Sequence, residues 1–181
     1  MIFVFLGLIF RVGITIYVSL FEVGHTLTYD SIRFYEDAID YSRYLSEKSI
    51  DPQLTYNIKN YFPVALGSIF HIFKFETYLL SSLCSNIIWF LSAIIFYKIL
   101  LKLNYEKKII NLSLFLYSFI FPTSVVYTSL LLREPYILFF LNLLAFYLIN
   151  INSASKKITF NNLALILFIS FCLFFLHDAN K

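Results

Sequence analysis

TYLLSSLCSNIIWFLSAIIFY, residues 77–97, contains no charged side chain and is long enough to cross a lipid bilayer as one helix. A helix needs about 20 apolar residues to span the hydrocarbon core. Residues 109–132 and 135–155 are also uncharged, and residues 158–176 are nearly as apolar. The whole chain is 60% hydrophobic with 14% charged residues, whereas a soluble domain has roughly 25%. The sequence therefore predicts an all-α, polytopic membrane protein that forms a single domain over residues 1–181.

The first apolar segment, residues 2–21, is interrupted by Arg11. A signal peptide carries its positive charge before the apolar stretch and small residues at a cleavage site, and neither feature is present here. We therefore expect a retained first span, in which Arg11 either extends toward an interface or faces the protein interior. Cys84 and Cys172 lie inside apolar runs, which favours small buried hydrophobic side chains over a disulfide or a metal pair.

The lysines predict the orientation of the spans. They cluster in residues 98–108 and at positions 156 and 157, and short lysine-rich loops stay on the cytoplasmic side. Residues 22–76 instead carry eight acidic and five basic residues, which suits an external loop. The amino terminus is then cytoplasmic, and the abundance of Ile, Phe, Asn and Lys favours a bacterial plasma (inner) membrane. Five spans are predicted, at residues 2–21, 77–98, 109–132, 135–153 and 158–176.

Individual residues refine this topology. A helix capped by Asp30 or Ser31 is predicted in the external loop, because apolar positions recur there at spacings of three and four. Residues 61–75 are apolar but short for a span, and as a crossing they would move the lysine loops outside. We therefore favour a helix lying in the outer interface. Pro122 is expected to kink the third span, and Asn142 to form a hydrogen bond between helices.

Two carboxylates are the candidate catalytic residues. Asp30 follows the first span and Glu134 follows the third, so both are predicted at the outer surface. Such a pair can bind a divalent cation (Mg²⁺ or Mn²⁺) or act as a base beside an electrostatic partner. Arg133 offers a planar, positively charged fork that suits a phosphate. The alternative roles are structural: Asp30 as a helix cap, Glu134 at the start of the fourth span, and Arg133 as a headgroup anchor.

The order of these features resembles the multi-spanning GT-C glycosyltransferases, which use polyprenyl-phosphate-linked sugars as donors. In that family a first span with an arginine precedes an external Asp with a nearby Arg-aromatic pair, which here reads DSIRFYEDA at residues 30–38. A surface segment with proline and aromatic residues follows, as YFP does at residues 61–63. The third span then ends in an acid, within YTSLLLREP at residues 127–135.

The resemblance implies sugar transfer from a lipid phosphate to an acceptor on the outer face, in the synthesis of a surface polysaccharide or glycoconjugate. Asp30 would be the catalytic base or a metal ligand, and Glu134 the second acid. Arg33, Tyr35 and Arg133 would bind substrate. Family members are longer, so the chain would correspond to their amino-terminal part.

Two other functions fit the same sequence. One is a non-catalytic membrane subunit, a scaffold or flippase-like component, of a polysaccharide or lipid export assembly. The other is a polymerase or ligase of surface polysaccharides, which would depend on external arginines, here Arg33, Arg43 and Arg133, and a histidine. Membrane lipid is the expected partner in every case. The net charge of +3 is small and dispersed, so it does not suggest nucleic acid.

Overall fold

The computed structural model describes residues 1–21, 29–47, 61–74, 77–119, 122–153 and 160–177. Throughout these ranges the regular structure is helical, which confirms the predicted all-α class. The helices are α1 (Ile2–Phe21), α2 (Tyr29–Glu47), α4 (Tyr61–Phe73), α5 (Tyr78–Lys102), α6 (Lys107–Phe119), α7 (Pro122–Ser129), α8 (Glu134–Ser153) and α9 (Phe160–His177).

Three of the helices are long and apolar enough to cross a membrane, namely α1, α5 and residues Glu134–Ile151 of α8. The prediction of a membrane protein is therefore supported, but the count of five spans is not confirmed. The apolar part of α9, Asn162–Leu176, is shorter. The predicted span at 109–132 is not one helix, because α6 ends at Phe119 and α7 begins at Pro122. Proline has no N–H for the helical hydrogen bond, which accounts for a break at this position.

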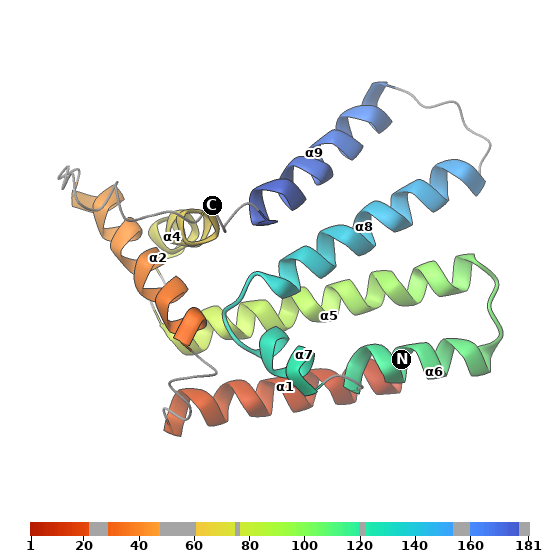
Figure 1. Cartoon of the computed structure of the whole chain (residues 1–181), viewed down its shortest axis with the longest axis horizontal. Coiled ribbons are helices and arrows are strands. Elements are labelled where there is room, and N and C mark those ends of the chain that lie inside the picture. Colours follow the sequence, from red (N-terminus) through yellow and green to blue (C-terminus); the bar gives the residue numbers. More distant parts are fainter. Residues whose placement is uncertain (22–28, 48–60, 75–76, 120–121, 154–159, 178–181) are drawn as a thin grey trace.

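The long helices lie side by side in the order α1, α5, α8 and α9, and α6 packs against α1 and α5 (Figure 1). One end of this bundle holds the start of α1, the end of α5, the start of α6 and the end of α8 (Figure 1). The opposite end carries α2 and α4, and we call it the α2–α4 end. The helices thus alternate in direction as the predicted topology requires, and the orientation of the bundle in a membrane stays a prediction.

Helices α2 and α4 form a separate layer that lies crosswise to the long helices (Figure 1). They approach closely at Gly67, where a Cβ atom would lie 2.5 Å from the carbonyl oxygen of Ala38. Buried side chains of α2 and α4 form one apolar cluster with Leu131, in the α7–α8 connection, and Leu176 of α9. The layer is therefore fixed to the bundle by side chains from both of these segments. That the α2–α4 layer lies at the membrane surface stays a prediction.

Of the two positions expected for Arg11, an interface or the protein interior, the structure shows the interior. Its side chain is fully buried, and the guanidinium lies 3.5 Å from the ring centroid of Trp89. Nε donates to Oγ1 of Thr128 (2.9 Å), and Nη1 donates to the carbonyl of Ser118 (3.1 Å). Pro122, four residues after Ser118, has no N–H to donate to that carbonyl. Arg11 therefore supplies a hydrogen bond that the broken helix lacks.

Thr15, one helical turn after Arg11, holds the end of α7. Its hydroxyl donates to the carbonyl of Ser129 at 2.5 Å and accepts from Nδ2 of Asn86 at 2.8 Å. The last carbonyls of a helix have no partner within the helix, so this bond satisfies one of them. Polar side chains of α1 thus hold α7 in place.

A second polar contact joins three helices near the middle of the bundle. Nδ2 of Asn142 in α8 donates to Oγ of Ser92 in α5 (2.9 Å) and to the hydroxyl of Tyr117 in α6 (3.1 Å). This confirms the predicted interhelical role of Asn142. Such bonds fix the rotation of helices about their axes, which apolar contacts alone leave less specific.

Substitution of Gly67 tests the α2–α4 contact. We expect Gly67→Ala to lower the free energy of unfolding by about 1–3 kcal/mol, because the added methyl group overpacks the contact with the Ala38 backbone. Gly13→Ala is the matched control, since a Cβ atom there meets nothing within 4 Å. Thermal unfolding in detergent compares the two variants. Equal melting temperatures would contradict the proposed tight contact.

Substitution of Arg11 tests its role in the broken helix. We expect Arg11→Met to destabilise the protein by about 1–3 kcal/mol, because the buried Ser118 carbonyl loses its donor. Trp89 is the single tryptophan of the chain, so its fluorescence should change together with stability. Lys98→Met, at an exposed position of α5, should change neither quantity. An Arg11→Met variant as stable as the parent would refute this role.

Candidate functional site

Asp30 lies in the first turn of α2 and is exposed. The helix begins at Tyr29, so Asp30 and Ser31 lie inside it rather than at the predicted cap position. A carboxylate in the first turn is favoured by the positive end of the helix dipole. Ser31 is buried and its hydroxyl is hydrogen-bonded to that of Tyr78 at the start of α5. Ser31 therefore fixes the turn that carries Asp30 against the bundle.

Glu134 is the first residue of α8 and is half-buried. Its Oε2 atom is buried and has no hydrogen-bond partner among the described residues. The charges of Asp30 and Arg133 both act on the Glu134 carboxyl group. Both predicted acids lie in the first turn of a helix, Asp30 in α2 and Glu134 in α8, and both helices begin at the α2–α4 end (Figure 1).

The three predicted substrate-binding residues have different surroundings. Arg133 is half-buried, and its Nη1 lies 3.5 Å from the carbonyl oxygen of Leu176. Arg33 is exposed on α2. Tyr35 packs edge-on against Tyr78 with 5.6 Å between ring centroids, so it contributes to the contact of α2 with α5. Of the three, Arg133 is the one whose charge acts on Glu134.

Asp37 is a carboxylate of α2 that is only partly exposed. Burial raises the pKa of Asp37, and the nearby Arg33 guanidinium opposes this rise. Arg33 therefore has a carboxylate neighbour on its own helix, which gives it a local structural role besides the predicted one.

A divalent cation at this site would depend on substrate for further ligands. In the described part of the chain, no three side chains of His, Cys, Asp or Glu gather into a metal-binding group. Mg²⁺ is commonly held by one or two carboxylates together with substrate phosphate and water. Asp30 and Glu134 fit that pattern, and Glu134 has a buried oxygen without a protein partner.

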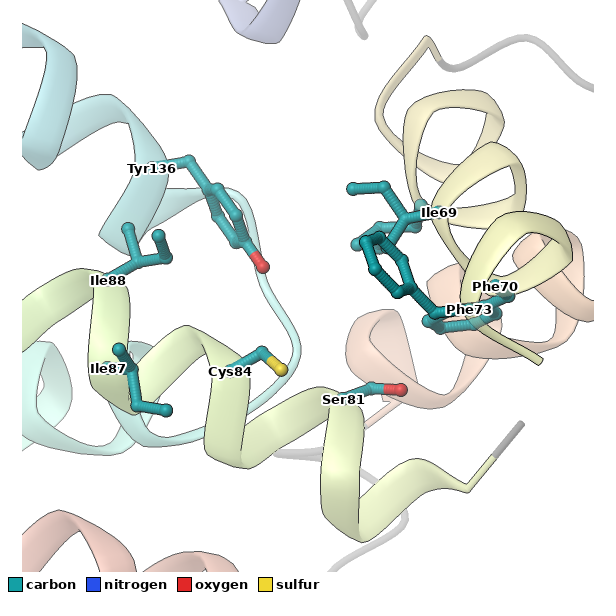
Figure 2. A pocket seen from close by; sticks show the side chains of 9 residues that line it. Ile69, Phe70, Phe73, Ser81, Cys84, Ile87, Ile88 and Tyr136 are labelled. Carbon is teal, nitrogen blue, oxygen red and sulfur yellow. The ribbon is translucent and has the colours of Figure 1, made fainter. Parts of the chain in front are cut away.

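Two apolar pockets lie beneath α4 that were not predicted from the sequence. The first, which we call the α5-side pocket, measures about 340 Å³. In Figure 2 the Tyr136 ring and the Cys84 thiol face Ile69 and Phe73 of α4 across it. Its lining consists of Leu66, Ile69, Phe70, Phe73, Ser81, Cys84, Ile87, Ile88 and Tyr136.

The second pocket lies between α4, α8 and α9 and measures about 300 Å³; we call it the α9-side pocket. It shares Leu66, Ile69 and Tyr136 with the first pocket, so the two adjoin. Its lining consists of Phe62, Ala65, Leu66, Ile69, Tyr136, Phe140, Phe171, Cys172, Phe175 and Leu176. Cys84 and Cys172 are free and half-buried, and each lines one pocket. The sequence gives little signal for these pockets, because their lining combines apolar residues from four helices that are distant in the chain, α4, α5, α8 and α9.

No protein-family model, curated protein or solved structure matches this chain. The resemblance to GT-C glycosyltransferases therefore rests on the order of sequence features described above.

Cross-linking tests the convergence of the two acids. In a background of Cys84→Ser and Cys172→Ser, the pair Asp30→Cys and Glu134→Cys should be joined by a bifunctional thiol reagent, because both positions lie at the α2–α4 end of the bundle. Asp40→Cys with Glu134→Cys is the control. Asp40 lies on the same helix, displaced by about 15 Å at a rise of 1.5 Å per residue. A higher yield for the control pair would show that the α2–α4 end is arranged differently.

Proposed function

We propose that this protein is a membrane glycosyltransferase that moves a sugar from a polyprenyl-phosphate donor to an acceptor on the outer face. The observation that supports this proposal is the placement of Asp30, at the start of α2, and of Arg133 and Glu134, at the start of α8, at the same end of an apolar helical bundle. Ionisable residues at the boundary of a membrane-spanning bundle are costly to keep, which favours a functional role. The proposal includes a bacterial plasma membrane, a cytoplasmic amino terminus and the synthesis of a surface polysaccharide or glycoconjugate.

The chemistry assigns a separate role to each charged residue. Asp30 is exposed, so its carboxylate can accept the proton of an acceptor hydroxyl as that oxygen attacks the anomeric carbon of the sugar. The bond from that carbon to the donor phosphate breaks, and its electron pair leaves with the polyprenyl phosphate. Arg133 stabilises the negative charge that develops on the phosphate, through paired hydrogen bonds that suit phosphate oxygens.

Glu134 is the second acid of the proposed site. Its unpartnered oxygen can accept a hydrogen bond from a sugar hydroxyl, or it can bind a metal ion jointly with Asp30. A bound Mg²⁺ or Mn²⁺ would neutralise charge on the donor phosphate. Arg33 and Tyr35 are the outer substrate contacts in this proposal, on the exposed and bundle-facing sides of α2 respectively.

Amide substitution of the acids tests the proposal. We expect Asp30→Asn to reduce sugar transfer by on the order of 10²–10⁴-fold, because the variant lacks the general base. Glu134→Gln should also reduce transfer while the protein still inserts in membranes. The assay uses proteoliposomes, a radiolabelled polyprenyl-phosphate sugar and equal amounts of each variant. Asp40→Asn is the control, since Asp40 is an exposed acid of the same helix.

The outcome also separates this proposal from its alternatives. Full activity of Asp30→Asn would contradict a catalytic acid pair and would favour the non-catalytic subunit of an export assembly. Retained activity in both acid variants together with its loss in Arg33→Gln or Arg43→Gln would favour a polymerase or ligase instead.

A further inference from the structure

Tyr136 forms a ridge between the two apolar pockets beneath α4. Both pockets include its side chain, with α5 forming the far wall of one and α9 that of the other. Their volumes are similar, about 340 and about 300 Å³. Because α8 lies between α5 and α9 in the row of helices (Figure 1), the pockets extend on opposite sides of the start of one helix.

The lining of both pockets suits hydrocarbon rather than a water-soluble ligand. Apart from Ser81, the Tyr136 hydroxyl and the two thiols, the side chains are aliphatic or aromatic. Several of them are also exposed at the protein surface: Phe73 by 66%, Ile87 by 55% and Phe171 by 63%. In a bilayer these surfaces contact lipid, so a hydrocarbon chain can enter either pocket sideways without crossing water.

The ridge begins at the charged turn of the site. Tyr136 follows Arg133 by three residues, and its backbone N–H donates to the Arg133 carbonyl at 3.1 Å. A phosphate beside this turn would meet the Arg133 guanidinium and the positive end of α8. The hydrocarbon chains of a ligand held there can separate at Tyr136 and enter the two pockets.

We propose that these pockets bind one two-chained glycerophospholipid, with one acyl chain in each pocket and the phosphate at Arg133. The two pockets match the forked shape of such a lipid, and Arg133 offers its phosphate a cation beside the Glu134 carboxylate. A polyprenyl phosphate has a single chain and would fill only one pocket from the same headgroup position. The phospholipid would compete with the proposed polyprenyl-phosphate donor for Arg133, but its binding requires no sugar transfer and is measured without it.

The two cysteines of the chain allow a direct test, because each lines a different pocket. Two single-cysteine variants are used: Cys172→Ser leaves Cys84, and Cys84→Ser leaves Cys172. Each purified protein is alkylated with N-ethylmaleimide in detergent, with increasing dioleoyl phosphatidylglycerol. At about ten times the half-saturating lipid concentration, both cysteines should react about tenfold more slowly. The half-saturating concentration should be the same for both, because one lipid molecule covers the two thiols.

Two further lipids distinguish one two-chained ligand, with a chain in each pocket, from one long chain that runs through both pockets. Lysophosphatidylglycerol and undecaprenyl phosphate each carry one chain, so neither should protect both cysteines fully. Equal protection of both cysteines by undecaprenyl phosphate would overturn the proposal in favour of one long chain in both pockets. Protection of a single cysteine by the two-chained lipid, or of neither, would also overturn it.

Variants of α4 provide the matched control for specific binding. Ile69 lines both pockets and is 40% exposed, so Ile69→Trp should fill the shared space and weaken protection of both cysteines. Ile72→Trp lies on the same helix at an exposed position that lines neither pocket, and it should leave protection unchanged. Native mass spectrometry of the parent protein should show one retained phospholipid per chain. Equal effects of the two substitutions would indicate nonspecific contact with lipid.

Discussion

The burial of Arg11 is the constraint on which the rest of the bundle depends. A cation inside an apolar helical bundle is tolerated only where the protein supplies polar partners, and here these are carbonyl and hydroxyl groups of α1, α6 and α7. The same guanidinium satisfies a carbonyl near the break at Pro122. Arg11 therefore donates a hydrogen bond to the Ser118 carbonyl near the break, and the residues on either side of the break provide acceptors for its guanidinium. The stacking of Arg11 on Trp89 adds a contact that holds α5 in the same arrangement.

This arrangement determines where the charged turn lies. Because Arg11 and Thr15 hold α7 at Thr128 and Ser129, the chain leaves α7 at a defined place. Residues 130–132 are then buried, and Leu131 packs into the cluster that joins α2 and α4. Asp30 reaches the same region by a separate route, through Ser31 and Tyr78. Two independent sets of contacts thus place Asp30 and Glu134 at the same end of the bundle.

Much of the fold was predictable because uncharged runs of span length have few stable conformations in a membrane. The helices at residues 2–21 and 77–97 and the role of Asn142 follow from local sequence, whereas Pro122 was expected to kink one span at 109–132 and instead begins a separate helix, α7. The position of Arg11 could not be predicted in the same way, since its partner Thr128 is 117 residues away and either orientation is physically reasonable. The pockets were unpredictable for a related reason: their walls combine residues from α4, α5, α8 and α9, and apolar residues lie on every face of these helices.

The crosswise position of α4 connects the apolar and charged parts of the α2–α4 end. α4 crosses the start of α8, and apolar pockets remain on both sides of Tyr136, lined by α5 on one side and by α9 on the other. The close approach at Gly67 holds α4 against α2, and α2 carries Asp30. Any lipid that occupies the pockets is therefore held by the layer that also positions the exposed carboxylate. Phospholipid binding in the pockets and the placement of Asp30 at the charged turn would then depend on the same α2–α4 contact.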